Sequence, residues 1–237
     1  MNIKIVYEDN NFLAINKPSG VLVHATTHGN NEGTLVEFLL SKYPEIKNVG
    51  DLPTGRQAFH IRPGIVHRLD KDTSGVMIIA KNQEYFLYLK NLFQTHKVTK
   101  TYLALVYGAV KEKEGIINKP IGLKPGTTKR TVFIKNAKMV KEAVTEYKLQ
   151  KIINIEGQEY SLLKVFPKTG RTHQIRVHLA SIGHPVVGDK QYGSKKLLSL
   201  VGRLFLHADS IEFEKSPGEV IKIGADLPKE LQIFLTK

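Results

Sequence analysis

The chain has 237 residues, of which 41% are hydrophobic and 24% charged, proportions that are typical of a folded domain and argue against disorder. It contains no cysteine, which excludes disulfide bonds, thiolate metal sites and a cysteine nucleophile. Lysine and arginine number 35 against 22 acidic residues, giving a formal charge of +13 and an isoelectric point near 9.7. This excess favours a polyanionic partner, although a basic protein charged only for solubility would have the same composition.

The amino-terminal segment does not have the features of a signal peptide, because it carries acidic residues early and has no uninterrupted apolar stretch. No stretch reaches the roughly 18 apolar residues of a membrane-spanning helix. No basic amphipathic helix with a bulky apolar face, the signature of a membrane-surface protein, is evident either. We therefore expect a soluble, cytoplasmic protein. We also expect a monomer, because the sequence implies no obligate protein partner.

Short strands, turns and one helix are expected in the first third of the chain. Alternation over residues 3–7 and an apolar run over 12–15 predict two strands joined by a turn. Apolar residues recur at helical spacing within 34–43, with Thr34 as the N-cap. Residues 49–63 are rich in proline and glycine and have no clear period, which predicts a loop.

The later part of the chain shows the same two kinds of apolar spacing, helical and strand-like. Residues 83–96 predict a helix with one apolar face, and residues 172–182 predict another that begins at a Thr172 cap. Further strands are predicted at 75–80, 101–107, 145–151, 160–165 and 204–213, and a closing helix at 229–235. Strands and helices mix without a regular βαβ rhythm, so we expect an α+β fold with a mixed, largely antiparallel sheet flanked by helices and loops, in a single domain 1–237.

Residues 67–75, HRLDKDTSG, gather polar side chains between two apolar runs. Asp70, with Arg68 two residues before it, should lie either at the edge of a sheet or inside a polar pocket. An exposed turn rich in Asp, Thr and Ser would have the same composition, so this segment alone leaves both interpretations open.

Residues 170–178, GRTHQIRVH, form the second unusual segment. On the predicted helix His173 and Arg176 are three residues apart and share one side. Arg171 lies near the helix N-terminus, where a phosphate group is favoured. A solvated basic helix face is the alternative.

The third segment is the predicted strand 101–107, where Tyr102 shares one face with Ala104 and Val106. A strand tyrosine usually contributes to packing, so Tyr102 alone would not indicate catalysis.

Together these segments resemble the RluA-type pseudouridine synthases. The matching stretches are 67–75, 102–108 (YLALVYG) and 170–193 (GRTHQIRVHLASIGHPVVGDKQYG), with weaker agreement over 7–24. The resemblance extends from about residue 3 to about residue 213 and implies the pseudouridine synthase catalytic fold. Many relatives carry a small S4-type RNA-binding domain before this one, and we expect the present chain to be the catalytic domain without it. Target choice would then depend on the catalytic lobe and on loops such as 49–63.

The resemblance implies that Asp70 is the catalytic nucleophile or base, that Arg176 pairs with it, and that Tyr102 lies under the target uracil. The reaction breaks the N1–C1′ bond, turns the uracil and joins C5 to C1′. Burial disfavours an ionised carboxylate and a neighbouring guanidinium favours it, so we expect Arg176 to keep Asp70 charged. Whether Asp70 attacks the sugar, adds to the base or only removes a proton is left open.

A target uridine must leave its stack to reach such a pocket. Arg68 is the candidate to fill the vacated space, by its proximity to Asp70 and by the resemblance. The further candidates for RNA contacts are His67, Thr73, Lys17, Arg171, His173 and Lys190. The implied substrate is a uridine in structured RNA, ribosomal RNA ahead of transfer RNA. The isomerisation is redox-neutral, so no cofactor or metal is expected.

Three other functions are less compatible with the sequence. A metal site built from His173, His178 and His184, with Asp70 or Asp189, lacks helical ligand spacing and has no cysteine. In a glycoside hydrolase, Asp70 and Asp72 alone could not flank a glycosidic bond at ~5–9 Å separation. A non-catalytic RNA-binding or ribosome-assembly protein on the same fold would share the charge, but it has no need of a carboxylate where anionic RNA binds. The sequence therefore favours an isomerase.

Overall fold

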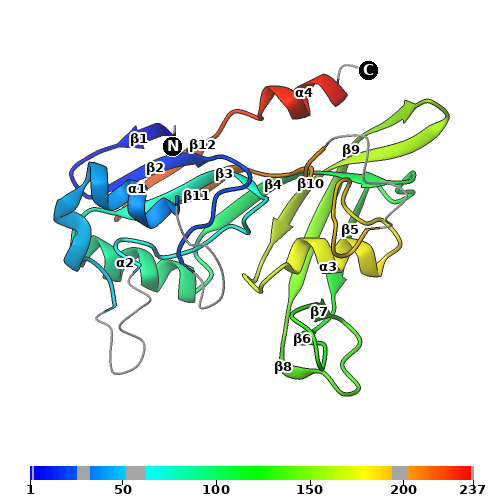
Figure 1. Ribbon diagram of the computed structural model, residues 1–237, viewed down its shortest axis with the longest axis horizontal. Coiled ribbons are helices and arrows are strands. Elements are labelled where there is room, and N and C mark those ends of the chain that lie inside the picture. The colour runs from blue at the N-terminus through cyan, green and yellow to red at the C-terminus, as the bar shows by residue number, and fades with distance from the viewer. Residues whose placement is uncertain (2, 26–32, 52–61, 194–201, 236–237) are drawn as a thin grey trace. The chain divides into compact units, whose positions relative to one another are not determined.

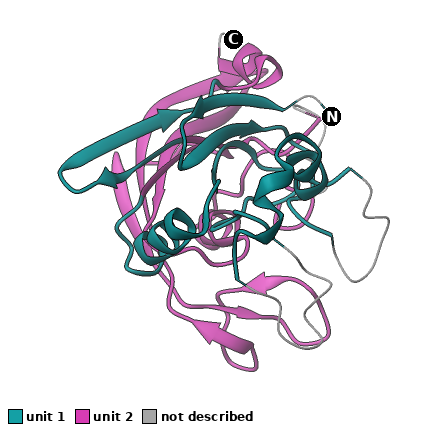
Figure 2. Ribbon diagram, turned by 90° about the vertical axis from the view of Figure 1, so that its left-hand side faces the viewer, with its two compact units in different colours: residues 1–98, 210–226 teal, residues 99–209, 227–237 magenta. Residues whose placement is uncertain are grey.

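The computed structural model describes residues 1, 3–25, 33–51, 62–193 and 202–235, drawn in Figure 1. The chain divides into two compact units, coloured separately in Figure 2: unit 1 comprises residues 1–98 and 210–226, and unit 2 comprises 99–209 and 227–237. Strand β11 (Leu206–Ser216) begins in unit 2 and ends in unit 1. The expectation of a single domain stays a prediction.

Unit 1 is an antiparallel sheet with helices packed on it. Strands β1 (Lys4–Glu8), β2 (Phe12–Lys17) and β3 (Ser74–Ala80) are consecutive neighbours, and β12 (Glu219–Gly224) pairs with β11. Every residue of β3 is buried, which agrees with its apolar run over residues 75–80. Helix α2 (Gln83–Gln94) sends Tyr85 onto the core, where its ring stacks on Phe12 with 5.3 Å between centroids.

Helix α1 (Leu35–Lys42) begins where the sequence predicts. Thr34 Oγ1 accepts the Glu37 N–H, and the Glu37 carboxylate accepts the Thr34 N–H, each at 3.2 Å. This reciprocal pair satisfies two of the helix's unpaired amide donors and fixes its first residue. The chain continues through the short 3₁₀ helix η1 (Pro44–Asn48).

Unit 2 contains a second set of antiparallel strands. Its strands lie in the order β4 (Thr99–Tyr107), β10 (Gln158–Pro167), β9 (Val144–Ile155), β5 (Glu114–Asn118). Helix α3 (Gln174–Ser181) packs on β9 and β10, placing Ile175 and Leu179 in the same apolar cluster as Ala104. Helix α4 (Lys229–Leu235) buries Leu231 in a second cluster.

A separate three-stranded sheet projects from unit 2, at the lower edge of this unit in Figure 1. It consists of β6 (Ile121–Leu123), β7 (Arg130–Thr131) and β8 (Lys138–Lys141), with β6 in the centre. We call residues 119–141, which contain these strands, the mini-sheet.

The structure confirms the expected fold class, a mixed and largely antiparallel sheet with helices. Strands β5 to β8 and β12 were not predicted, because they are short or polar and show no clean alternation. Most of the predicted loop 49–63 lies outside the described residues. Within the described part of the chain, no helix is long and apolar enough to cross a membrane.

Candidate active site

Asp70 lies in unit 1, on the segment that leads into β3, and its side chain is half-buried. Its carbonyl accepts the Thr73 N–H at 3.2 Å, which closes a turn over Lys71 and Asp72. Because β3 follows at once and is buried throughout, this turn is fixed to the core of unit 1. We refer to residues 70–73 as the Asp70 turn.

Residues 17–21 hold the Asp70 turn through its carbonyl groups. The Lys71 carbonyl accepts hydrogen bonds from the Gly20 N–H at 2.9 Å and from Lys17 Nζ at 3.0 Å. The Ser19 hydroxyl donates to the Asp72 carbonyl at 2.7 Å. The backbone that carries the Asp70 carboxylate is therefore restrained both by residues 17–21 and by the buried strand β3, as a positioned catalytic group requires.

Lys17 is fully buried. Its ammonium group also donates to the carbonyls of Pro18 and Val21, both at 2.9 Å, so these bonds and the one to Lys71 use all three of its donors. This geometry argues against the predicted phosphate contact and assigns Lys17 the role of a buried brace.

His67 and Thr73 also have internal roles. His67 Nε2 accepts the Ile78 N–H of β3 at 2.9 Å, and the ring stacks on Phe93 of α2 at 4.6 Å. Thr73 is only 2% exposed. His67 Nε2 is thus occupied by β3 and Thr73 is buried, while the direct contacts of both residues with RNA stay predictions.

Arg68 is exposed and belongs to a cationic cluster. Its Nη1 lies 3.3 Å from His24 Nε2, and Arg62 Nη2 lies 2.9 Å from the same nitrogen. Burial and the charge of Arg68 both lower the pKa of Arg62. Two guanidinium groups that share one ring nitrogen favour an anion beside them. Sequence reasoning missed His24, which lies at the end of the weakly matching stretch 7–24.

In unit 2, helix α3 begins in an unexpected way. The N-cap is His173, in a left-handed conformation with φ of 56°, and it makes no side-chain capping bond. The predicted Thr172 cap is therefore wrong. His173 Nδ1 instead lies 2.9 Å from Tyr192 Oη, and that oxygen accepts the Arg130 N–H at 3.0 Å. The start of α3 is thus fixed through Tyr192 to β7.

Arg176 forms a buried bidentate pair with Asp189. Its Nε and Nη2 donate to the two carboxylate oxygens at 2.7 and 2.9 Å, and the residues are 8% and 1% exposed. A guanidinium has five N–H donors, and this pair uses two of them. The cation also lies over the Tyr192 ring, 5.2 Å from its centroid.

Asp189 keeps its charge despite its burial. Burial alone raises the pKa of this carboxyl, but the hydrogen bonds and charge of Arg176 lower it more. The backbone N–H groups of Gln191 and Tyr192 also donate to Asp189 Oδ1, at 2.8 and 3.0 Å. Sequence reasoning did not select Asp189 as a site residue, although it lies within the matching stretch 170–193.

Gly188 explains why the chain can place Asp189 there. Its φ is +75°, and a Cβ at this position would collide with the carbonyl of Arg203. Only glycine combines this backbone conformation with so close an approach.

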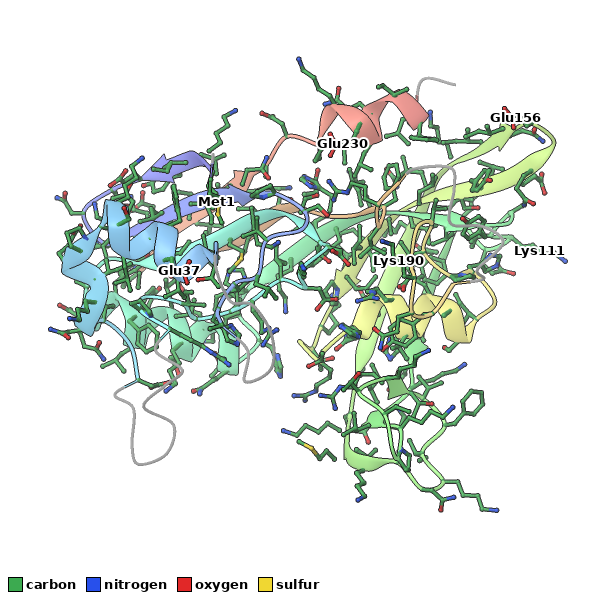
Figure 3. The ribbon with its side chains drawn as sticks, viewed as in Figure 1. Met1, Glu37, Lys111, Glu156, Lys190 and Glu230 are labelled. Atoms are coloured by element: carbon green, nitrogen blue, oxygen red, sulfur yellow. The ribbon has the colours of Figure 1, made fainter. Side chains whose placement is uncertain are left out.

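The other unit 2 candidates surround the same helix. Arg171 is half-buried, its Nε donates to the Glu142 carbonyl at 3.0 Å, and its N–H donates to Gln174 Oε1. Lys190 is exposed on the loop after α3, labelled in Figure 3. Tyr102 is half-buried on β4 and packs against the apolar cluster that contains Ile175.

The structure therefore gathers His173, Arg176 and Arg171 at the start of α3 in unit 2, while Asp70 and Arg68 belong to unit 1. The pairing of Asp70 with Arg176, which belong to different units, stays a prediction.

The histidines of the alternative metal site have other hydrogen-bond partners in the structure. His178 Nδ1 and Nε2 lie 2.9 Å from Thr145 Oγ1 and the Lys119 carbonyl, and His184 Nδ1 lies 2.8 Å from the Tyr107 carbonyl. Within the residues described, no group of three or more His, Asp or Glu side chains could hold a metal ion.

Comparison with known proteins gives consistent matches. The family model described as RNA pseudouridylate synthase matches residues 11–181. An uncharacterized RNA pseudouridine synthase of Aquifex aeolicus is 46% identical over 206 residues, which are 84% of this chain and 61% of that relative. The chain thus spans less than two thirds of that protein. The ribosomal large subunit pseudouridine synthase D of Borreliella burgdorferi is 38% identical over 99% of this chain and 68% of its own length.

A solved structure agrees with these matches. Human RNA pseudouridylate synthase domain containing 1 has a TM-score of 0.77 and 27% identity, and the match covers 96% of this chain and 84% of that one. The matches confirm the resemblance stated from the motifs. The chain belongs to the RNA pseudouridylate synthase family.

Proposed function

We propose that this protein isomerises a uridine of large-subunit ribosomal RNA to pseudouridine, with Asp70 as the catalytic carboxylate. The observation that carries the proposal is the Asp70 turn. Its half-buried carboxylate follows the exposed Arg68, and its backbone is held by Lys17, Ser19 and Gly20. A restrained anionic group beside a cationic cluster suits chemistry on a nucleotide, because the cations hold phosphate while the carboxylate acts on the sugar or base.

The reaction balances without any added reagent. The N1–C1′ bond breaks, the uracil turns, the C5–C1′ bond forms, the proton on C5 leaves, and N1 ends with a proton. A carboxylate can serve as the nucleophile at C1′ or on the ring, or as the base that removes a proton. All three routes require Asp70 to be ionised at the start.

Arg176 and Tyr102 are the proposed partners of Asp70 in this reaction. Arg176 is held in one orientation by Asp189, so its cation can support a carboxylate with little loss of side-chain entropy. Tyr102 offers a ring for stacking on uracil and a hydroxyl for the proton that leaves C5. Arg68 is proposed to occupy the space that the flipped base vacates.

The choice of ribosomal RNA follows the names of relatives. Two proteins at 38% and 36% identity, from Borreliella burgdorferi and Nitrosomonas europaea, are named ribosomal large subunit pseudouridine synthase D. Transfer RNA is the alternative substrate, and the same experiment tests it.

The test incubates the purified chain with unmodified ribosomal and transfer RNA transcripts and maps pseudouridine by carbodiimide-dependent stops of reverse transcription. We expect new stops in large-subunit ribosomal RNA with the native protein and none with Asp70→Asn. Asp72→Asn is the matched control, because Asp72 is exposed in the same turn and should retain activity. Arg68→Ala should slow the reaction more on a structured RNA than on a short loop.

Three results would contradict the proposal in different ways. Stops that persist in Asp70→Asn would show that the reaction does not need the Asp70 carboxylate. Stops only in transfer RNA would show that transfer RNA, and not ribosomal RNA, is the substrate. Salt-sensitive RNA binding without stops on any transcript would favour a non-catalytic assembly role.

A further inference from the structure

The mini-sheet, residues 119–141, differs from the rest of unit 2 in its charge. It holds seven of the 35 basic residues and no aspartate or glutamate. The basic residues are Lys119, Lys124, Lys129, Arg130, Lys135, Lys138 and Lys141. Figure 3 shows nitrogen-tipped side chains extending from this part of the molecule. Such a local excess of one sign attracts a ligand of the opposite sign.

The mini-sheet also exposes large apolar side chains. Phe133 is 84% exposed, more than any other large apolar side chain in the described part of the chain, and Met139 is 68% exposed. Ile134 and Val140 are exposed as well, and all four residues of β8 face solvent. Apolar groups gathered on one small element mark a contact surface rather than scattered surface residues.

The backbone of the mini-sheet is organised despite this exposure. The Lys124 N–H donates to the Lys129 carbonyl at 2.9 Å and closes the hairpin between β6 and β7. The Phe133 N–H donates to Thr131 Oγ1 at 3.0 Å, which fixes the start of the segment that carries the ring. Because Tyr192 Oη accepts the Arg130 N–H, the mini-sheet is also tied to the start of α3.

We propose that the mini-sheet is an RNA-docking surface on which Phe133 stacks on an unpaired base while the surrounding lysines contact phosphates. This inference rests on the RNA substrate proposed above. An aromatic ring among cations, with no acidic residue, suits single-stranded or looped RNA, because every base has a face for stacking and every phosphate is an acceptor. An apolar protein partner would not require seven cations, so RNA is the occupant to which we commit.

The first experiment measures binding to an unmodified large-subunit ribosomal RNA transcript at several salt concentrations. In one variant, exposed Lys129, Lys135 and Lys138 are replaced by glutamine. The matched control replaces exposed Lys111, Lys113 and Lys164 of the same unit, and so removes the same charge elsewhere. We expect the slope of log affinity against log salt to fall by roughly two to three in the variant and by less than one in the control.

The second experiment isolates the stacking. The chain has no tryptophan, so Phe133→Trp creates a single fluorescent reporter at the proposed stacking position. Ile152→Trp is the control, because Ile152 is also exposed on unit 2 but lies in β9. We expect the same transcript to quench Phe133→Trp with saturation and to leave Ile152→Trp unchanged. Phe133→Ala should weaken binding roughly ten-fold or more without changing the salt slope.

The outcomes separate this inference from the proposed function. If the variants bind RNA like the native chain, or if the control lysines matter equally, the docking surface is overturned even when the native protein forms pseudouridine. If quenching and the altered slope are observed but no transcript gains pseudouridine, the docking surface stands and the proposed reaction fails. Quenching of both tryptophans alike would also overturn the specific role of Phe133.

Discussion

Lys17 and Arg176 are both cations removed from water, and each is stabilised by a fixed set of oxygen atoms. Lys17 donates to three carbonyls, whereas Arg176 donates to both oxygens of Asp189. Burying a charge is costly unless its hydrogen bonds are satisfied. Each residue therefore ties together the segments that supply its partners: the Asp70 turn for Lys17, and the start of α3 with the loop after it for Arg176.

Replacing Lys17 by methionine should destabilise unit 1 and slow the reaction. The change keeps the length of the side chain but leaves three buried carbonyls without this donor, at a cost of about 2–4 kcal/mol in the free energy of unfolding. A looser Asp70 turn should lower kcat by about 10- to 100-fold at a temperature where the variant is folded. Denaturant unfolding and pseudouridine formation measure the two effects.

Lys71→Met provides the matched control for this variant. The Lys71 side chain is exposed and only its carbonyl accepts the bond from Lys17, so this replacement should leave stability and kcat nearly unchanged. Equal losses in both variants would contradict the proposed brace.

Replacing Asp189 by asparagine should leave the buried Arg176 charge uncompensated and cost about 3–5 kcal/mol. The pKa of Asp189 is below the ordinary value of 3.8, so its contribution is present above pH 3.8 and is lost as pH falls further toward the folded-state pKa. The difference in stability between native protein and variant should therefore be constant near neutrality and shrink in acid. Unfolding curves at a series of pH values measure it.

Asp226→Asn is the control for the ion pair. Asp226 pairs with Lys4 at 3.0 Å, but both side chains are largely exposed, so its loss should have little effect. A variant at Asp189 that behaved like the one at Asp226 would show that Arg176 does not need its partner.

At the scale of elements, α3 is held by a chain of hydrogen bonds that runs through its buried polar side chains. Gln174 Nε2 donates to Thr145 Oγ1 at 3.0 Å, and Thr145 Oγ1 lies 2.9 Å from His178 Nδ1. Because the Lys119 carbonyl can only accept a hydrogen bond, His178 Nε2 carries the ring proton and donates it to this carbonyl. His178 Nδ1 then accepts a hydrogen bond from the Thr145 hydroxyl. One neutral imidazole thus connects α3 with β9 and with the first residue of the mini-sheet.

Protonation of His178 should destabilise unit 2. Burial lowers its pKa from 6.5, so the unfolded chain binds the proton more readily than the folded protein. The contribution of His178 is therefore complete above about pH 6.5, and the free energy of unfolding should fall as pH drops below that value. His178→Asn should flatten this part of the pH profile, whereas His96→Asn, at an exposed residue, should keep it. An unchanged profile in His178→Asn would contradict the assignment.

At the scale of the whole molecule, the excess of basic residues is distributed unevenly. The formal charge of +13 predicts a polyanionic partner, but only the structure shows that residues 119–141 form a separate exposed sheet rather than a loop over the core. The arginines near His24 form a second concentration in unit 1. The salt dependence expected for RNA binding is the macroscopic consequence of the first of these clusters.

Several elements could be predicted because their local signals agree with their burial. The Thr34 cap and the apolar run of β3 are examples. The start of α3 could not be predicted from local signals. His173 adopts a left-handed conformation that its contact with Tyr192 helps to hold, and Tyr192 lies 19 residues away in the sequence. Likewise, β5 is a strand because β9 pairs with it, with Gly115 opposite Tyr147.

The motifs around Asp70 and Arg176 by themselves indicated the family, and with it the expected class of reaction. They also selected Asp70, Tyr102 and Arg176 as candidates. Only the tertiary structure shows that Lys17 is buried against three carbonyls, and that Arg176 is paired with Asp189. The reason is physical: a lysine or arginine has the same local sequence signature whether its charge meets solvent, RNA or a buried oxygen, and the partner comes from a distant part of the chain.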